Sequence, residues 1–395
     1  MVQYAGRMEN MKGSIIRQLL ALASKPEVLS FAGGMPAPEL FPTEKLLAAT
    51  EAVMNEQGRV ALQYSTTEGF YHFREQIAER MARKNGVKTS PDSILVISGS
   101  QQGLDYSARL FCDPGDVIII ESPTYLGALN AFKGCEPRFV SVPTDDDGMI
   151  MEELEKVLET TDRVKMMYVI PDFQNPSGRT WTLERRQKFM EIINRYEIPV
   201  IEDNPYGELR FEGENMPALK SMDTKGLVVF LGTFSKILAT GYRLGWICAD
   251  GDIMKKYNLI AQASALQAST EAQLVFSKFI DMFDLDEHVD TIKACYRRRR
   301  DLMIGTMEKE FPPEAKFTRP NGGLFTWVEL PEYIDTKELF KSCLERNLAF
   351  VPGDGFYPDE GHTNCLRLNY STMTDENIVK GMTILGQVLK DQIRK

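Results

Sequence analysis

The stretch LVVFLGTFSK, residues 227–236, joins a short apolar run to a polar turn that ends in Lys236. Its apolar part is rich in β-branched residues and almost free of polar ones, which is typical of a strand buried on both faces of a sheet. A lysine just past such a strand can be desolvated, which lowers its pKa and frees the amine as a nucleophile. The stretch therefore predicts a buried strand with a reactive amine at its carboxyl end.

Similar runs alternate with helix-length patterns from about residue 94 to residue 249, with turn signals between them. Besides Leu227–Leu231, the runs are Ile94–Ser98, Val117–Glu121, Arg138–Val142, Val164–Ile170, Pro199–Asp203 and Leu244–Ala249. This alternation favours an α/β domain with a mostly parallel, seven-stranded sheet flanked by helices. Ligands of such sheets bind at the carboxyl ends of the strands, so the polar residues there are the candidates for chemistry.

The rest of the chain predicts a smaller α+β domain. Residues 251 to about 310 have a helical pattern, and Ser14 can cap a short amphipathic helix. Short strands at Leu324–Leu330, Ala349–Pro352 and Cys365–Tyr370 alternate with helices around 335–346 and 373–393. We expect three segments: residues 1–48, which join the small domain, residues 49–285, which form the large domain, and residues 286–395, which form the small one.

Composition excludes several classes of protein. The net charge of the 395-residue chain is −10, which disfavours binding to a nucleic-acid backbone. No apolar run approaches the roughly 18 residues of a membrane span. Its six cysteines are scattered singly, so neither a zinc site nor a disulfide framework is indicated, and a reducing cytoplasm is the expected compartment. The three histidines stand in no catalytic or metal-binding motif, so a lysine or a carboxylate is the expected acid–base group.

Two segments suit a phosphate monoester. Ser100 and Gln101 follow the strand Ile94–Ser98 and open a helix, where outward N–H groups at a positive helix end can hold an anion. Ser235 and Arg243 flank Lys236 with a hydroxyl and a guanidinium. Alternatively, the first segment is a plain turn with a serine cap, and the second is an ordinary loop lysine with an unrelated arginine.

Polar and aromatic residues follow three more strands. Asp203 can pair with a protonated pyridine nitrogen, and it is better placed than Glu202 because a strand alternates its faces. Asn175 can donate to a phenolate oxygen, Tyr206 could join it, and Tyr125 could stack on an aromatic ring. Helix caps, an Asn-Pro turn and a core tyrosine are the plainer alternatives. Ser122-Pro123 and Asn175-Pro176 are candidate cis peptides.

Arg367 stands inside the apolar strand Cys365–Tyr370. A charge there needs a partner, and the α-carboxylate of an amino acid would supply one in fork geometry. The alternative is an edge-strand arginine that faces water.

The joint order of GSQQ, ESPTY, FQNPSG, EDNPYGEL, GTFSK with GYRLGW, and LRLNYS covers essentially the whole chain. This order resembles the fold-type I pyridoxal-phosphate aminotransferases of class I and II. The stretch SFAGGMPAPELFP, residues 30–42, and the stretch LQYS, residues 62–65, resemble the 2-aminoadipate/kynurenine aminotransferase branch. One departure is Thr240-Gly241-Tyr242, which stands where close relatives often carry Pro-Gly-Leu.

The resemblance implies pyridoxal 5′-phosphate as cofactor and a role for each candidate residue. Lys236 holds the cofactor as an imine and then moves the proton between the substrate Cα and the cofactor. Asp203 pairs with the ring nitrogen, Asn175 and Tyr206 bond the 3′-oxygen, and Tyr125 stacks on the ring. The residues that hold the phosphate are Ser100, Gln101, Ser235 and Arg243.

The resemblance also implies a homodimer, because Tyr64 would reach the phosphate bound by the other subunit. Arg367, Gly34 and Asn175 would bind the substrate, and Arg17 occupies the position of an arginine that meets the distal carboxylate of dicarboxylic substrates. A solvated helix face is the alternative for Arg17.

The expected reaction is ping-pong transamination between an L-amino acid and 2-oxoglutarate. The donor is 2-aminoadipate, an aromatic amino acid, kynurenine or several of these. A fold-type I lyase or decarboxylase, a regulator with an aminotransferase-like domain and a non-catalytic cofactor-binding protein are the alternatives. The regulator is disfavoured because the aminotransferase-like pattern begins within the first dozen residues and the chain is acidic.

Overall fold

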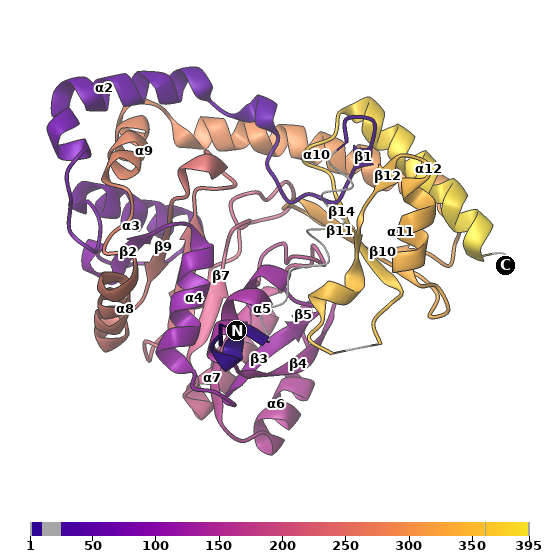
Figure 1. Cartoon of the computed structure of the whole chain (residues 1–395), viewed down its shortest axis with the longest axis horizontal. Helices are drawn as coiled ribbons and strands as arrows, with labels where there is room; N and C mark the ends of the chain where they lie inside the picture. Colours follow the sequence, from indigo (N-terminus) through magenta and orange to yellow (C-terminus); the bar gives the residue numbers. More distant parts are fainter. Residues whose placement is uncertain (1, 10–24, 360, 394–395) are drawn as a thin grey trace.

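The seven predicted runs all form strands of one sheet in the computed structural model, which describes residues 2–9, 25–359 and 361–393 (Figure 1). In the spatial order of the sheet, the strands are β2 (Ile94–Ile97), β9 (Gly245–Cys248), β8 (Val228–Thr233), β7 (Val200–Asp203), β6 (Val164–Val169), β3 (Val117–Ser122), β4 (Arg138–Asp145) and β5 (Gly148–Met149). The sheet therefore has eight strands instead of seven. The additional strand, β5, has two residues and turns back on β4, so it is too short to give a periodic signal in the sequence.

The sheet is mostly parallel, as predicted. Strands β4, β3, β6, β7 and β8 run in one direction, whereas β9 is antiparallel to both of its neighbours. All four residues of β2 and of β9 are buried, which explains the continuous apolar character of these runs.

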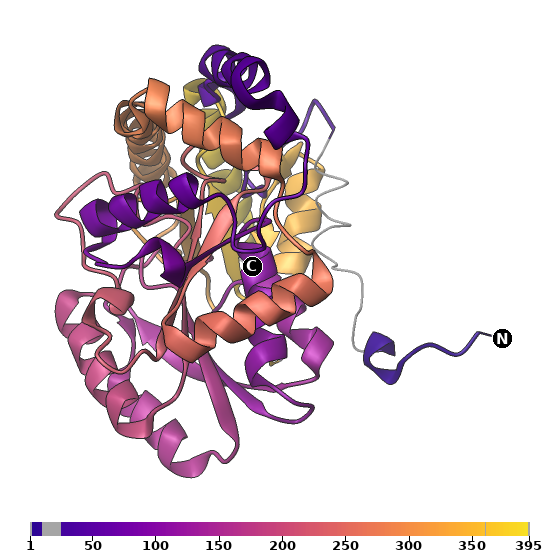
Figure 2. The same cartoon turned by 90° about the vertical axis from the view of Figure 1, so that its left-hand side faces the viewer.

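Helices lie on both faces of the sheet (Figure 2). One cluster of buried side chains joins the sheet to α4 (Ser100–Phe111), α5 (Leu126–Phe132) and α8 (Gly251–Ser264). A separate cluster joins it to α6 (Met151–Thr160) and α7 (Leu183–Tyr196). Helices therefore cover both faces of the sheet.

Four further helices share a core cluster with side chains of β2, β8 and β9. They are α2 (Thr43–Ala61), α3 (Tyr71–Asn85), α9 (Thr270–Met282) and α10 (Leu285–Glu310). In Figure 1, helix α10 runs below α2, from α9 toward the C-terminal part of the chain. The 3-10 helices are η1 (Gly6–Glu9), η2 (Pro38–Leu40), η3 (Pro91–Ser93), η4 (Lys133–Cys135), η5 (Leu219–Met222), η6 (Thr240–Tyr242) and η7 (Gly353–Phe356).

A second, antiparallel sheet occupies the C-terminal part. Its strands are, in order, β10 (Lys316–Phe317), β11 (Phe325–Glu329), β14 (Cys365–Asn369) and β13 (Val351–Pro352), and its helices are α11 (Thr336–Leu344) and α12 (Asp375–Ile393). The predicted strand Ala349–Pro352 is divided, because β12 (Leu348–Ala349) pairs instead with β1 (Leu29–Ser30). The N-terminal segment thus adds a strand beside the C-terminal part.

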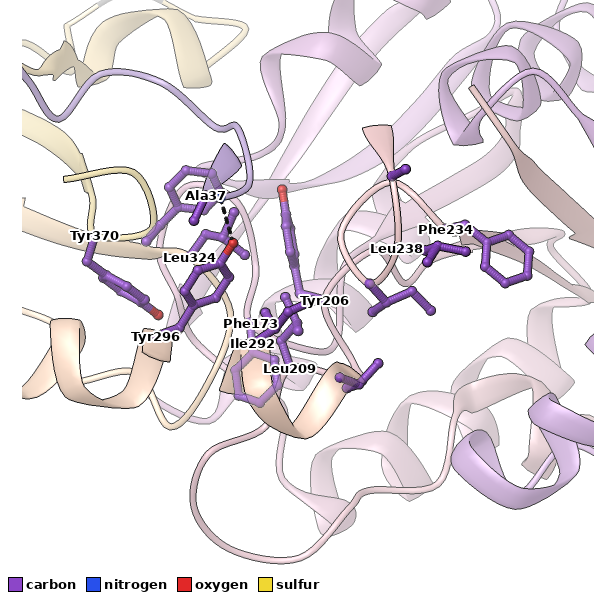
Figure 3. Packing of buried hydrophobic residues seen from close by; sticks show 14 of the residues in the cluster. Ala37, Phe173, Tyr206, Leu209, Phe234, Leu238, Ile292, Tyr296, Leu324 and Tyr370 are labelled. Carbon is purple, nitrogen blue, oxygen red and sulfur yellow. Dashed lines mark hydrogen bonds between the residues drawn. The ribbon is translucent and has the colours of Figure 1, made fainter. Parts of the chain in front are cut away.

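The largest core cluster connects the two sheets (Figure 3). Tyr296 of α10 accepts a hydrogen bond of 2.9 Å from the backbone N–H of Ala37, which attaches the N-terminal segment to this core. Tyr206 and Phe173 follow strands of the large sheet, and Tyr370 follows β14. The helix predicted after Ser14 lies outside the described residues. In the part of the chain that the structure describes, no helix is long and apolar enough to cross a membrane.

Candidate active site

A cavity of about 490 Å³ opens at the carboxyl ends of the strands, a size that suits a small molecule. Five of the strand ends contribute a predicted residue: Ser100 follows β2, Tyr125 follows β3, Asn175 follows β6, Asp203 ends β7 and Lys236 follows β8. The other lining residues are Gly34, Gln101, Leu126, Gly127, Asn130, Ile170, Pro205, Tyr206, Thr233, Ser235, Thr240, Arg243, Phe325, Phe356 and Arg367.

Lys236 carries the nucleophile of the cavity. Its Nζ donates a hydrogen bond of 2.8 Å to the backbone oxygen of Gly34. Burial, together with the nearby guanidinium groups of Arg243 and Arg367, lowers the pKa of Lys236 to about 8. A substantial fraction of this amine is therefore neutral near pH 8, and a neutral amine can attack an aldehyde.

One end of the cavity is built for an anion. Helix α4 begins at Ser100, and the preceding Gly99 has φ +75°. A Cβ atom on Gly99 would lie 2.5 Å from Nη2 of Arg243, so only glycine lets this guanidinium approach the helix end. Ser235 Oγ accepts two hydrogen bonds, one of 3.3 Å from Nη1 of Arg243 and one of 3.0 Å from Oγ1 of Thr233. The Ser235 hydroxyl can therefore donate its own proton to a ligand oxygen.

Asp203 presents an open carboxylate oxygen. Its Oδ2 accepts a hydrogen bond of 2.9 Å from the hydroxyl of Tyr168, while its buried Oδ1 has no partner among the described residues. Burial raises the pKa of Asp203 to about 7. Glu202 lies on the other face of β7 and accepts 2.8 and 2.9 Å hydrogen bonds from the backbone N–H groups of Leu219 and Lys220. The structure thus places the aspartate, and not the glutamate, at the cavity.

Arg367 is buried, so the alternative of an edge-strand arginine facing water is wrong. It lies on β14, between β11 and β13. Its guanidinium donates hydrogen bonds of 2.8 Å to Asn175 Oδ1 and to the backbone oxygen of Ala32. Phe325 and Phe356 lie 4.2 and 5.1 Å from it, measured to the ring centroids. Burial lowers the pKa of Arg367 to about 10, so the group is still a cation at neutral pH.

The remaining predicted residues are placed as follows. Asn175 Nδ2 lies 3.5 Å from the hydroxyl of Tyr206, and both residues line the cavity. Gln101 Nε2 donates to the backbone oxygen of Gly127 at 2.8 Å. Ser122-Pro123 and Asn175-Pro176 are cis peptides, as predicted. Tyr64 is 78% exposed and does not line the cavity, and Arg17 lies outside the described residues.

Sequence reasoning missed several residues of the site. Phe325, Phe356 and Thr233 line the cavity, and Tyr168 supports Asp203 from outside it. The aromatic residues stand in or beside apolar strands, where a core position is the plain interpretation. Thr233 and Thr240 stand in segments that the sequence singled out, GTFSK and Thr240-Gly241-Tyr242, but neither residue was given a role.

These groups fit pyridoxal 5′-phosphate. The amine of Lys236 suits the aldehyde, the anion-binding end suits the phosphate, and the open oxygen of Asp203 suits a protonated ring nitrogen. Together with a mostly parallel sheet and a smaller second sheet, they define a pyridoxal-phosphate-dependent enzyme of fold type I.

Comparisons with known proteins identify the family. Residues 35–385 match the family described as aminotransferase class I and II. Aromatic-amino-acid aminotransferase 1 of Thermococcus litoralis is 42% identical over 98% of this chain and 93% of its own length. The kynurenine aminotransferase of Pyrococcus horikoshii, solved in complex with PMP, has a TM-score of 0.95 at 37% identity and covers 99% of this chain and 98% of its own. LysN, the α-aminoadipate aminotransferase of Thermus thermophilus, solved with N-(5′-phosphopyridoxyl)-L-leucine, has a TM-score of 0.92 at 35% identity over 99% and 98%.

The chain belongs to the class I and II aminotransferases. It is a pyridoxal 5′-phosphate-dependent enzyme that catalyses transamination, as the sequence predicted. These relatives do not favour the alternatives of a lyase, a decarboxylase, a regulator or a non-catalytic binding protein.

Proposed function

We propose that this aminotransferase accepts an aromatic or dicarboxylic L-amino acid, including 2-aminoadipate and kynurenine, with 2-oxoglutarate as the amino acceptor. The relatives that carry the names aromatic-amino-acid, kynurenine and α-aminoadipate aminotransferase support this range. The observation that carries the proposal is the position of Arg367, a buried cation in the cavity between two aromatic rings. Arg367 can take a carboxylate in fork geometry, while Phe325 and Phe356 form an apolar wall beside it.

Lys236 is the proposed proton carrier of the reaction. Pyridoxal 5′-phosphate, when bound, supplies an aldehyde and an electron-accepting ring. Lys236 would hold the cofactor through its amine, and the same amine, once free of the cofactor, would carry a proton between the substrate Cα and the cofactor. Its lowered pKa supports this role, because a base that works near neutral pH must release its proton readily.

The other residues hold the reactants in place. Asp203 keeps the ring nitrogen protonated, Asn175 and Tyr206 bind the 3′-oxygen, and Tyr125 stacks on the ring. Ser100, Gln101, Ser235 and Arg243 bind the phosphate. Arg367, Gly34 and Asn175 bind the α-carboxylate side of the substrate, and we assign Arg17 to a distal carboxylate.

We further propose that the enzyme is a cytoplasmic homodimer in which Tyr64 completes the phosphate site of the partner subunit. The exposure of Tyr64, 78% of the residue, supports a contact outside its own subunit. The proposed division is residues 1–48 and 286–395 for the small domain and 49–285 for the large one. The pairing of β1 with β12 supports this division.

Borohydride trapping followed by peptide mapping tests the central assignment. The phosphopyridoxyl mass is expected on Lys236, and its appearance on another lysine, or on none, would overturn the proposal. Mixing the enzyme with a donor alone distinguishes transamination from a lyase reaction. A transaminase stops after one turnover without an oxo acid, whereas a lyase keeps releasing product.

A donor panel tests the substrate assignment. With 2-oxoglutarate as acceptor, Arg17→Ala should lower kcat/KM more for dicarboxylic donors than for aromatic donors. The difference, expressed as a free energy of activation, should be about 2–4 kcal/mol. Equal losses for both kinds of donor would contradict the assignment of Arg17 to the distal carboxylate and leave the other assignments intact.

A further inference from the structure

Tyr168 lies behind the cavity and does not line it. It belongs to β6, next to β7, and is fully buried. Its ring packs edge-on against Phe132 of α5, with the centroids 5.5 Å apart and the planes at 78°. This packing fixes the direction in which the hydroxyl points.

That hydroxyl is the one donor to the Asp203 carboxylate among the described residues. It lies 2.9 Å from Oδ2, while Oδ1 is left without a partner in a residue that lines the cavity. A buried carboxylate with one free oxygen is costly unless a ligand satisfies that oxygen. The arrangement therefore leaves one position open for a donor from the ligand.

The cations of the cavity are engaged elsewhere. Lys236 donates to Gly34, Arg243 to Ser235 and Thr240, and Arg367 to Asn175 and Ala32. None of these bonds reaches Asp203. Within the protein, the protonation state and the orientation of the Asp203 carboxylate consequently depend on Tyr168.

Tyr168 keeps its phenolic proton and can donate it to Asp203. Burial, together with the negative charge of Asp203, raises its pKa well above the ordinary value for tyrosine, so the phenol keeps its proton over the working pH range. A donor that never ionises lowers the pKa of the acid it bonds, because it stabilises the charged form of that acid.

We propose that Tyr168 is a positioning residue: it holds the ionised carboxylate of Asp203 so that Oδ1 is directed at the ring nitrogen of the cofactor. This inference rests on the proposed role of Asp203. It assigns the protonation of the ring to a pair of residues, of which only one touches the cofactor.

The test uses Tyr168→Phe, which removes the hydroxyl and keeps the ring. Apoprotein is reconstituted with cofactor that carries ¹⁵N in its ring, and both the ¹⁵N chemical shift and the cofactor dissociation constant are measured. We expect the shift to move toward that of the unprotonated ring and the dissociation constant to rise about 10-fold. The matched control is Tyr257→Phe, which removes a buried hydroxyl bonded at 2.7 Å to Ser107 in the same core cluster, and it should leave both readouts unchanged.

Asp203→Asn and the double variant complete the cycle. If Tyr168 acts through Asp203, Tyr168→Phe adds little in the Asp203→Asn background. A normal ¹⁵N shift in Tyr168→Phe, beside an altered one in Asp203→Asn, would overturn the role of Tyr168 and leave the proposed function standing. An unaltered shift in Asp203→Asn would overturn the role of Asp203 itself, and that of Tyr168 with it.

Discussion

The guanidinium of Arg367 donates a hydrogen bond of 2.8 Å to the side-chain oxygen of Asn175, which lies 192 positions earlier in the chain. The contact joins β14 of the small sheet to the segment after β6 of the large one. It presents a cation to the cavity at the place where the two sheets meet.

Replacing Arg367 by lysine should weaken substrate binding selectively. Lysine keeps the charge but cannot make the two parallel hydrogen bonds of a guanidinium to a carboxylate. We therefore expect kcat/KM to fall about 10- to 150-fold, which corresponds to the free energy of a hydrogen bond to a charged group. Cofactor affinity, measured by absorbance titration, should stay within about two-fold. Arg179→Lys is the control, because Arg179 pairs with Asp146 and Glu329 and does not line the cavity. An equal loss in both variants would contradict the assignment.

The reactivity of Lys236 should follow a pKa of about 8. The neutral amine reacts, so the rate of cofactor attachment to apoprotein should rise with pH and reach half its maximum near pH 8. The sign for stability is the same: between pH 8 and the ordinary pKa of lysine, near 10.5, the folded chain has lost a proton that the unfolded chain keeps, so rising pH favours folding through this group. The measurement is a pH series of labelling rates by mass spectrometry.

Lys255 provides the internal comparison in that series. It is exposed, and its hydrogen bond to Asp252 raises its pKa above the ordinary value. The rate at which the cofactor labels Lys255 should reach half its maximum at a pH well above the corresponding pH for Lys236. Coincident profiles for the two lysines would show that burial does not activate Lys236.

Gly99→Ala should damage the phosphate site. A methyl group at this position meets Nη2 of Arg243 at 2.5 Å, and the backbone there, with φ +75° and ψ 159°, is accessible at low cost only to glycine. We expect cofactor affinity to fall at least about 10-fold as the guanidinium is displaced. Gly226→Ala is the control. Gly226 has a comparable φ of +72°, and a Cβ atom there would make only ordinary contacts, so this variant should lose stability but keep its cofactor affinity.

Asp172→Ala should destabilise the protein strongly. Asp172 is buried and accepts hydrogen bonds from Arg186 at 2.7 Å, from Asn204 at 3.0 Å and from Arg210 at 3.4 Å. Its removal leaves two buried guanidinium groups without their anion, at a cost of about 3–5 kcal/mol. Urea unfolding measures this loss. Asp301→Ala, which breaks an ion pair whose acidic side chain is 56% exposed, should cost less than about 1 kcal/mol.

The sequence predicted the strands and most of the cavity because both follow from local rules. Period-two alternation distinguished Asp203 from Glu202, and the carboxyl-end rule brought Lys236, Asn175 and Tyr125 to one place. The two-residue strand β5 gave no periodic signal, so the number of strands was one too low.

The contacts missed were those that depend on tertiary packing. The carbonyl of Gly34 meets Lys236 across 202 positions, and no pattern in either segment specifies that meeting. Tyr168 has the sequence context of any core tyrosine, because its hydroxyl partner stands on a neighbouring strand. Phe325 begins the strand β11 and Phe356 ends the 3-10 helix η7, and their contact with Arg367 exists only in three dimensions.

The cavity has three origins in the chain. Gly34 comes from the N-terminal segment, and residues from Ser100 to Arg243 supply the amine, the anion site and Asp203. Phe325, Phe356 and Arg367 come from the C-terminal third. A ribosome that has translated as far as Arg243 has already made every residue assigned to hold the cofactor within one subunit. Arg367, which is assigned to the substrate carboxylate, is still missing from that nascent chain. During synthesis, the residues that retain the cofactor are therefore made before the cation that recognises an amino acid.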